Sequence, residues 1–391
     1  MSIRNILNYN NDEDSSIKVS NGLTHFKSGY KTHTNFSKNC VDIMSLSNTF
    51  NSSCTVFFDI DKIGDLLSNI TLSLEIEKIN TDDKAFLGDV EIVEEILYAL
   101  IDTISFKCGD KVLQTFSGYW IYIWHQLNSN KNENMLDSAS LYEFNKIGDK
   151  YYLNLQIPFW FCREINKSFP LVALENEKIT VELKLIDFNK IKGFNINFNI
   201  ENVKLICEYI NLDNDEKLNY INNSLEYIIE QIDFTTESID ENSSSIKKID
   251  IPKYPYVNEL IWVLVNTHIK TNFNNYFNFS NIHLENHMKE VRILFNGKLI
   301  NSNLKPSYYN KIQMYQNHTN ASFFKKNSIY SHSFALNNDK INPSGILSLN
   351  KYNTVVLELK ILPVGRKRDL ILFIKKFNIM RIKDGYLHLL V

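Results

Sequence analysis

The sequence of 391 residues predicts an all-β protein built from two similar β-sandwiches in tandem. Three observations predict this fold class. Several segments alternate strictly between apolar and polar residues. A strand and hairpin pattern from the first half of the chain returns in the second half. A helical pattern and a polar stretch lie just past the middle, where we expect a boundary between two domains.

Apolar side chains occupy every second position in several segments, with Thr, Ser, Glu, Lys or Asn between them. Successive side chains of a strand point to opposite faces, so each segment predicts a strand with one buried and one hydrated face. Such strands are typical of antiparallel sheets in sandwiches. The segments are Ile70–Ile76, Ile179–Leu185, Phe194–Ile200 and Val355–Ile361. Leu260–Val265 and Leu370–Ile374 are continuous apolar runs of strand length, too short to span a membrane.

An internal repeat supports the division into two sandwiches. In each half, a strand-like segment runs into a turn signal and then into an aromatic-rich segment. Asn-Gly between apolar residues is a strong hairpin signal, and Gly-Asp is a plausible equivalent. The two copies lie roughly 180 residues apart. They are Ile104–Cys108 with Gly109-Asp110 and Tyr119–Trp124, and Val291–Phe295 with Asn296-Gly297 and Tyr308–Tyr315.

One segment shows helical spacing instead. Its apolar residues are three and four positions apart: Leu218, Ile221, Leu225, Ile228 and Ile232. Asp213, followed by Glu216, resembles a capping box, so the pattern predicts a helix over 214–231. The polar stretch Thr235–Lys248 then predicts a linker between the two sandwiches.

Composition excludes several classes of protein. With 44% hydrophobic residues, the chain has enough apolar material to fold. Its 42 basic and 45 acidic residues argue against direct binding of nucleic acid, which usually requires a basic excess. The N-terminal sequence shows no signal-peptide pattern, and the five cysteines are scattered, so we expect a reducing cytosolic environment without disulfides.

No motif in the sequence predicts catalysis, a cofactor or a metal. His283 and His287 are four residues apart, but no third ligand is placed with them. Asp59 and Asp61 favour edge carboxylates over a metal site. Gly297-Lys298 and Pro343-Ser344-Gly345 lack the spacing of a phosphate loop and of a nucleophile elbow, and they predict turns. We therefore predict no catalytic, cofactor-binding or metal-binding residues and no enzymatic activity.

Two further features are interpreted as structural and not as binding sites. The basic run Gly365–Arg368 favours a solvated loop between two strands over a nucleic-acid or membrane contact. The aromatic residues Phe159-Trp160-Phe161, Trp120 and Trp124 favour packing in a core or an interface over the stacking of sugars or bases.

The segment His25–Phe36 reads His-Phe-Lys-Ser-Gly-Tyr-Lys-Thr-His-Thr-Asn-Phe, and Pro158–Cys162 reads Pro-Phe-Trp-Phe-Cys. These and further segments, in their order along the chain, resemble the double jelly-roll major capsid proteins of nucleocytoplasmic large DNA viruses. The segment His25–Phe36 resembles the pattern Phe-Lys-x-x-Tyr-x-x-His-Thr-x-Phe that opens the first jelly roll of that family. Pro158–Cys162 with Phe169–Leu174 is similar to its pattern Pro-Phe-Trp-Phe and Leu-Pro-Leu-x-Ala-Leu. The other similar segments are Ala99–Gly109, Ile123–Leu127, Leu212–Gln231, Asn258–Val263, Asn342–Ile346 and Asn378–Gly385.

The resemblance implies two eight-stranded jelly rolls joined by a helix and a polar linker. The domain limits that we expect are an N-terminal arm at 1–24, a first jelly roll at 25–212, the linker helix and polar linker at 213–250 and a second jelly roll at 251–391. The resemblance also implies a structural protein of an icosahedral capsid that forms pseudo-hexagonal homotrimeric capsomers. The short chain predicts trimmed loops at the capsid exterior.

The expected partners are two further copies of the chain, neighbouring capsomers, and penton and minor capsid proteins. Contact with the internal viral membrane is left open. The expected location is the virion, after assembly in the host cytoplasm. Two alternatives remain at this stage: a minor capsid or scaffold paralogue of the same family, and a tandem jelly-roll hydrolase that cleaves glycans. Such a hydrolase would need two carboxylates about 5–10 Å apart across a concave cleft.

Overall fold

The computed structural model describes residues 33–47, 49–80, 95–128, 135–142, 145–175, 177–191, 196–240, 246–266, 276–280, 288–301, 304–319, 328–363 and 367–390. The chain divides into two units, residues 1–35 and 36–391. All the helices and strands described below belong to the second unit. The predicted arm at 1–24 lies outside the described residues, as do His25, His283 and His287.

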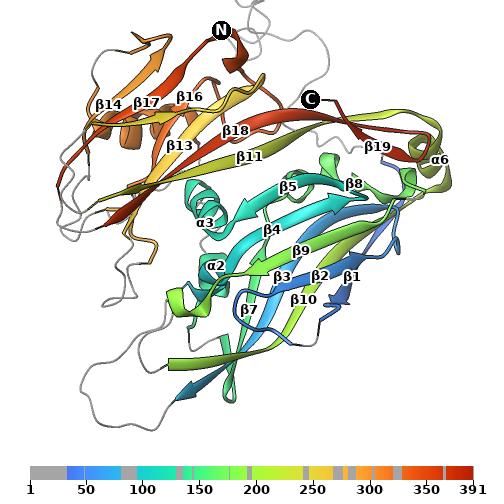
Figure 1. Cartoon of the computed structure of the whole chain (residues 1–391). Helices are drawn as coiled ribbons and strands as arrows, with labels where there is room; N and C mark the ends of the chain where they lie inside the picture. Colours follow the sequence, from blue (N-terminus) through green and yellow to red (C-terminus); the bar gives the residue numbers. More distant parts are fainter. Residues whose placement is uncertain are drawn as a thin grey trace, which may run out of the picture. The chain divides into compact units, whose positions relative to one another are not determined.

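Two antiparallel sheets form the first sandwich (Figure 1). Its strands run from blue to green in that picture. The first sheet has the order β1 (Phe36–Met44), β10 (Ile196–Leu212), β3 (Leu66–Asn80), β7 (Lys150–Gln156) and β6 (Lys146–Ile147), with β8 (Phe169–Pro170) beside β3. The second sheet has the order β2 (Thr55–Ile60), β9 (Ile179–Leu185), β4 (Ile101–Cys108) and β5 (Lys111–Ser117).

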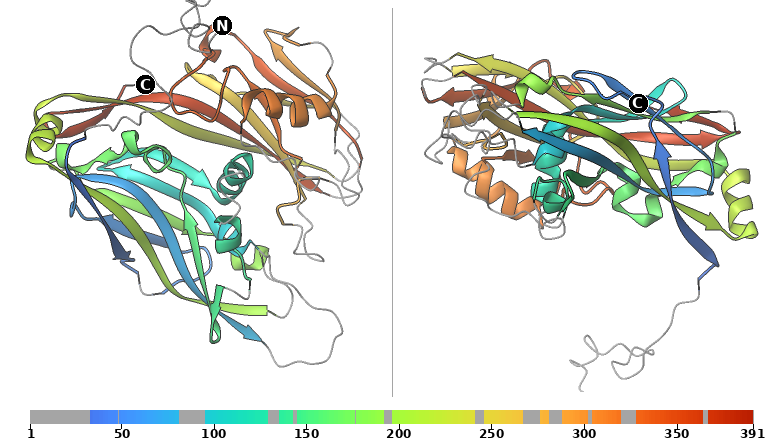
Figure 2. Two further views of the ribbon diagram at one scale, coloured as in Figure 1. Left: turned by 180° about the vertical axis from the view of Figure 1, so that it is seen from behind. Right: turned by 90° about the horizontal axis from the view of Figure 1, so that it is seen from below.

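The second sandwich, yellow to red in Figure 1 and in the turned views of Figure 2, has the same plan. Its first sheet has the order β11 (Leu225–Ile239), β18 (Arg368–Lys383), β13 (Val257–Asn266) and β16 (Tyr330–Ser333), with β19 (Tyr386–Leu389) beside β18. Its second sheet has the order β12 (Ile246–Asp250), β17 (Val355–Ile361), β14 (Met288–Phe295) and β15 (Lys298–Leu299). In both sandwiches the strands therefore follow one another across the sheets in the same chain order, so the predicted duplication is confirmed.

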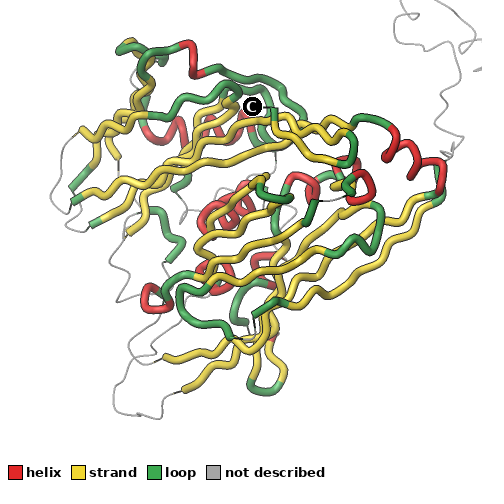
Figure 3. The backbone as a smooth tube through the Cα atoms, turned by 45° about the vertical axis from the view of Figure 1, so that its right-hand side comes forward, coloured by secondary structure: helices red, strands yellow, loops and turns green. Residues whose placement is uncertain are grey.

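The helices are short and connect strands (Figure 3). They are α2 (Ile96–Leu100), α3 (Gly118–Leu127), α5 (Trp160–Arg163), α6 (Asn214–Asn222) and α7 (Gln313–Asn317), with a π-helical turn η7 (Tyr308–Ile312) and the 3-10 turns η3 (Ile165–Lys167), η4 (Leu171–Ala173), η5 (Phe188–Lys190) and η8 (Leu349–Lys351). No helix of the described ranges is both long and apolar enough to cross a lipid bilayer.

The repeated hairpins form where the sequence predicts them. Gly109, with φ of 56°, begins the turn between β4 and β5. Asn296 and Gly297, with φ of 49° and 75°, form the turn between β14 and β15, as in the hairpin turns that favour Asn-Gly. The aromatic segment after each hairpin is helical: α3 in the first sandwich, and η7 with α7 in the second.

The alternating segments are strands, as predicted. In β3, Ile70 and Leu72 are fully buried, and β9 and β17 likewise bury every second side chain. Phe194 lies outside the described residues, whereas the rest of its segment belongs to β10. The continuous apolar runs are strands of a different kind, because β13 and β18 are buried on both faces.

Two core clusters explain these doubly buried strands. Leu260, Trp262 and Leu264 of β13 pack inside the second sandwich. Ile261 and Val263, on the other face of that strand, belong to a cluster that continues into the interior of the first sandwich. The sheet of β11, β18, β13 and β16 therefore has a second buried face, which packs on the first sandwich.

The predicted helix over 214–231 is too long. Asp213 caps α6 as expected, since its carboxylate accepts from the Asn214 N–H at 2.8 Å, but the helix ends at Asn222. From Leu225 onward the chain pairs with β18 residue by residue through Ile239. Pairing in the sheet buries Ile229 and Ile232, whereas α6 buries no side chain, and this tertiary contact overrides the local helical spacing.

The predicted polar linker over 235–248 is also wrong where the structure describes it. Residues 235–239 belong to β11, and residues from Ile246 belong to β12, which pairs with β17. Residues 241–245 lie outside the described part of the chain. The limits of the domains themselves stay a prediction.

Candidate functional site at the junction of the two sandwiches

The junction is the set of contacts between the first sandwich and the second face of the β11–β18–β13–β16 sheet. Helix α3 lies there because β5 delivers it to that face (Figure 1). Its first turn is capped by Ser117, whose Oγ accepts from the Trp120 N–H at 3.2 Å. Gly118 is required for the close approach to α2, since a Cβ there would lie 2.1 Å from the Tyr98 carbonyl oxygen.

Aromatic side chains form the apolar part of the junction. The ring of Trp120 lies 5.3 Å from that of Phe373 of β18, and Trp120 is almost fully buried. Tyr119 stacks on Tyr276 at 5.5 Å. The interpretation of Trp120 as a packing residue is therefore confirmed. It is also confirmed for Phe159, Trp160 and Phe161, which are fully buried in the first sandwich.

A buried ion-pair chain crosses the junction. Arg163 at the end of α5 contacts Glu230 of β11 at 2.8 Å, and Lys375 of β18 contacts the same carboxylate at 2.9 Å. All three side chains are less than a tenth exposed. Burial alone would raise the pKa of Glu230, but Arg163 and Lys375 outweigh it and lower that pKa below its ordinary value. Arg163 also lies over the ring of Trp124, at 5.1 Å.

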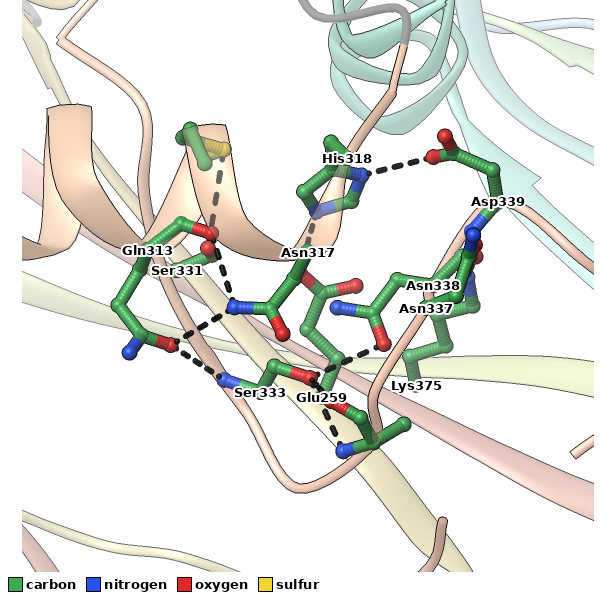
Figure 4. A network of polar contacts seen from close by, with 12 residues as sticks. Glu259, Gln313, Asn317, His318, Ser331, Ser333, Asn337, Asn338, Asp339 and Lys375 are labelled. Carbon is green, nitrogen blue, oxygen red and sulfur yellow. Dashed lines mark hydrogen bonds and ion pairs between the residues drawn. The ribbon is translucent and has the colours of Figure 1, made fainter. Parts of the chain in front are cut away.

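A second charged cluster, formed by His318, Glu259 and Asp339, lies next to these ion pairs (Figure 4). We call it the His318 site. His318 follows α7, and its Nε2 lies 2.7 Å from Oε1 of Glu259 on β13. Its Nδ1 lies 3.1 Å from Oδ1 of Asp339, in the loop after β16. Lys375 links the two clusters, because its Nζ donates to the Asn338 carbonyl oxygen at 2.8 Å.

The charges of the His318 site stabilise one another. Burial would lower the pKa of His318, but Glu259 and Asp339 raise it to about 9. Burial would raise the pKa of Asp339, but His318 and Thr319 lower it to about 2. At neutral pH the site is therefore a cation held between two carboxylates.

Hydrogen bonds between side chains and backbone groups complete the junction. The side-chain amide of Gln114 donates to the Glu230 carbonyl oxygen and accepts from the Trp160 N–H at 3.1 Å. Gln231 donates to the Leu113 carbonyl oxygen at 2.9 Å. At the far end, Lys111 donates to the Leu387 carbonyl oxygen in β19. Polar contacts between the sandwiches thus reach from α5 to the C-terminal hairpin.

Two cavities open along the junction. One, of about 470 Å³, is lined among others by Tyr119, Asp102 and Asp369. The other, of about 580 Å³, is lined among others by Trp124 and Asp339. Three of the four carboxylates that line these cavities have partners: Asp102 pairs with Lys184 at 2.8 Å, Asp369 accepts from Ser238 at 2.8 Å, and Asp339 is bound to His318. The fourth is Glu164, beside the second cavity. This arrangement favours a structural role for the three paired acids over general acid–base work.

The residues that the sequence analysis considered for metal binding or catalysis form ion pairs, turns or loops. Asp59 of β2 pairs with Lys178 at 2.7 Å, and Asp61 lies in the loop beyond β2. Gly297-Lys298 is the tip of a hairpin, and Ser344 bonds the backbone of Asn337. Across the described ranges there is no group of three acidic, His or Cys side chains that fits a metal. The prediction of no catalytic, cofactor-binding or metal-binding residues stays a prediction.

The interpretation of the basic run as a solvated loop is wrong for Arg368. Arg368 is the first residue of β18 and is fully buried, with its guanidinium donating to the Leu362 carbonyl oxygen at 2.9 Å. It is not part of a solvated loop. Residues 364–366 lie outside the described part of the chain. The five cysteines, all of them described, carry free thiols.

The sequence reasoning missed the charged residues of the junction. A signal was present, because each of the strand residues interrupts an apolar run. Glu230 follows Ile228-Ile229, Glu259 precedes Leu260-Ile261-Trp262, and Lys375 follows Phe373-Ile374. A charge inside such a run is almost never fully buried unless it has a partner. The identity of the partners, His318, Asp339 and Arg163, had no signal in the sequence.

Two solved structures with a similar fold come from viral capsids. A chain of the quasi-atomic model of the PBCV-1 virus capsid matches with a TM-score of 0.77 and 19% identity, over 94% of this chain and 100% of that chain. The Faustovirus major capsid protein matches with a TM-score of 0.75 and 9% identity, over 95% of this chain and 96% of that one. The fold is therefore that of the double jelly-roll capsid proteins.

Sequence comparison identifies the family. The family described as "Major capsid protein N-terminus" matches residues 24–229, and "Large eukaryotic DNA virus major capsid protein" matches residues 216–387. The chain belongs to this family of major capsid proteins of large eukaryotic DNA viruses, and its role is structural.

Individual relatives agree. The "Major capsid protein" of Pyramimonas orientalis virus is 25% identical over 397 aligned residues, which cover 93% of this chain and 92% of that protein. The "Probable capsid protein 4" of Acanthamoeba polyphaga mimivirus is 33% identical over 171 residues, which cover 41% of this chain and 33% of that protein.

Proposed function

We propose that this chain forms a homotrimeric capsomer with a pseudo-hexagonal outline, which tiles an icosahedral shell. The observation that carries the proposal is the repeated strand order of the two sandwiches in one chain. Three copies about a three-fold axis would present six similar lobes. Such a tile can cover a flat facet with sixfold packing although only three chains build it.

The buried junction supports this proposal. A tile works only if its lobes keep a fixed spacing, and interfaces inside a chain that are small and polar allow the domains to move. Here one apolar cluster runs from the first sandwich to the second face of the β11–β18–β13–β16 sheet, and the ion pairs of Glu230 lie within the same contact. The two lobes of each chain would therefore act as one rigid body.

The proposed partners are the other two copies, neighbouring capsomers, and penton and minor capsid proteins, in a virion that is assembled in the host cytoplasm. We further propose that the chain has no enzymatic activity. The pairing of Asp102, Asp369 and Asp339 at the two junction cavities supports this, because a glycosidase needs carboxylates that are free to act on a substrate.

Sedimentation equilibrium of the purified full chain tests the oligomeric state. We expect a single species with three times the chain mass of 45.7 kDa at micromolar concentration. Obligate assemblies of this kind bury roughly 2,000 Å² or more per pair of subunits, so the trimer should persist on dilution. A stable monomer or dimer would contradict the proposal.

A further inference from the structure

The geometry of the His318 site fixes its protonation state. Both ring nitrogens face carboxylate oxygens, Nε2 that of Glu259 and Nδ1 that of Asp339. Neutral imidazole carries one N–H and can donate to only one of them, whereas imidazolium donates to both. Asp339 is held ionised by further donors, because its Oδ2 accepts from the backbone N–H of Thr319 at 2.6 Å and from the Thr319 hydroxyl. With both carboxylates ionised, the arrangement requires a proton on each nitrogen of His318.

Charge balance across the junction requires the same proton. The two linked clusters contain three cationic and three anionic side chains, each at most 11% exposed: Arg163, Lys375 and His318 with Glu230, Glu259 and Asp339. Loss of the His318 proton would leave one buried negative charge without compensation. Within the described residues, Oε2 of Glu259 has no hydrogen-bond partner, so His318 is the contact that holds this carboxylate.

Among the described residues around the site, the groups named below do not replace this proton. His332 of β16 also feels the charge of Glu259, but burial lowers its pKa to about 4, so it is neutral at physiological pH. Lys375 of β18 is already bound to Glu230 and to the Asn338 carbonyl oxygen. On the side of the first sandwich, α3 and the residue after it present Trp120, Trp124 and Asn128, which carry no charge. Arg163 is engaged by Glu230.

His318 also connects three pieces of the second sandwich. It is the C-cap residue of α7, with its N–H on the Met314 carbonyl oxygen at 2.9 Å. Its ring joins that helix to β13 through Glu259 and to the loop after β16 through Asp339. The same loop bonds back to α7, because the Asn338 N–H donates to the Asn317 carbonyl oxygen at 3.0 Å.

We propose that His318 is a proton-dependent latch. While it holds its proton, it ties α7, β13 and the loop after β16 together beneath α3 of the first sandwich. When it loses the proton, the buried carboxylates repel each other, and this side of the junction loosens.

The latch predicts a defined pH dependence. The pKa of His318 is raised from 6.5 to about 9 in the folded chain, against the effect of burial, by Glu259 and Asp339. Below pH 6.5 both the folded and the unfolded chain hold the proton, so the stabilisation is complete. Between pH 6.5 and about 9 only the folded chain holds it, and the unfolding equilibrium constant should rise about tenfold per pH unit. Cys thiols and Tyr phenols affect the unfolding equilibrium only at higher pH, because their ordinary pKa values are 9.0 and above.

Urea unfolding of the full chain between pH 6.5 and 9 tests the latch. We expect the wild type to lose stability over this range and His318→Gln to show a much flatter profile. His388→Gln is the matched control, because His388 is exposed on β19, and its profile should follow the wild type. A flat wild-type profile, or an unchanged slope in His318→Gln, would overturn the proposal.

A second measurement does not depend on the folding of that variant. Nuclear magnetic resonance of histidine-labelled wild-type protein reports the protonation of each imidazole. At a pH midway between 6.5 and 9, we expect one buried ring with both nitrogens protonated, which titrates at the upper end of this range. In Glu259→Gln the same ring should titrate at least one pH unit lower. If every buried imidazole is neutral at that pH, the latch does not exist.

Discussion

Charged side chains inside the junction are stable only as partners of one another. Arg163 is the residue that the first sandwich contributes to the chain of ion pairs, and its partner Glu230 is fully buried. Removing one member of such a pair leaves the other charge buried without compensation, which is more costly than the pair itself is favourable. The stability of the junction should therefore respond strongly to single substitutions at these positions.

We expect Arg163→Met to lower the free energy of unfolding by about 3–5 kcal/mol, because it leaves Glu230 with Lys375 alone. Urea unfolding at neutral pH measures the change. The control is Arg381→Met, which removes an exposed ion pair with Glu226 and should cost less than about 1 kcal/mol. Equal changes in the free energy of unfolding for the two substitutions would show that the buried pair contributes no more to stability than the exposed pair.

Among the elements, the strands, the hairpins and the start of the central helix were predictable, but the end of that helix was not. Alternation along Ile70–Ile76 and the Asn296-Gly297 turn are local signals that the fold keeps, because one face of each sheet must be buried. The helical spacing continues through Leu225, Ile228 and Ile232, but the place of these residues is decided by pairing with β18, which lies more than a hundred residues away in sequence. A local pattern cannot report such a partner.

The contacts of the candidate site could not be predicted from the sequence for a similar reason. The junction exists because both faces of β13 and β18 are buried, and the apolar runs predict strands of that kind. Which charge meets which depends on the packing of one sandwich on the other. His318 comes to Glu259 across 59 positions of sequence, and Arg163 to Glu230 across 67.

The C-terminal hairpin of β18 and β19 is a second fastening between the sandwiches. Leu387 of β19 is fully buried in the cluster that continues into the first sandwich, and Lys111 of β5 binds its carbonyl oxygen. The turn at Gly385, with φ of 79°, lies against Glu175 of the first sandwich. This element should therefore stabilise both sandwiches together.

We expect Leu387→Ala to lower the free energy of unfolding by about 2–5 kcal/mol, because it leaves a cavity in a shared core. Urea unfolding followed by tryptophan fluorescence measures the loss, and both sandwiches should still unfold in one transition. Leu390→Ala is the control, since Leu390 is 45% exposed and its truncation should have little effect. A loss confined to the second sandwich would contradict a joint role for the hairpin.

For the whole molecule, buried neutral histidines lower the stability of the fold at acid pH. Burial lowers the pKa of His125 to about 3 and that of His332 to about 4, so both are neutral in the folded chain. As the pH falls below 6.5, the unfolded chain takes up protons that these folded side chains cannot accept. Stability should therefore decline from pH 6.5 toward 4, and His332→Gln should reduce that slope in urea unfolding. An acid slope unchanged in His332→Gln would contradict this assignment.

In the proposed capsomer, one chain carries two matching lobes in a rigid unit, so that three chains can act as a sixfold tile. Electron microscopy of the purified full chain, with averaging of single particles, tests it most directly. We expect particles with three-fold symmetry, a hexagonal outline and six similar lobes in projection. Particles with one or two lobes, or trimers whose lobes take variable positions, would contradict the account.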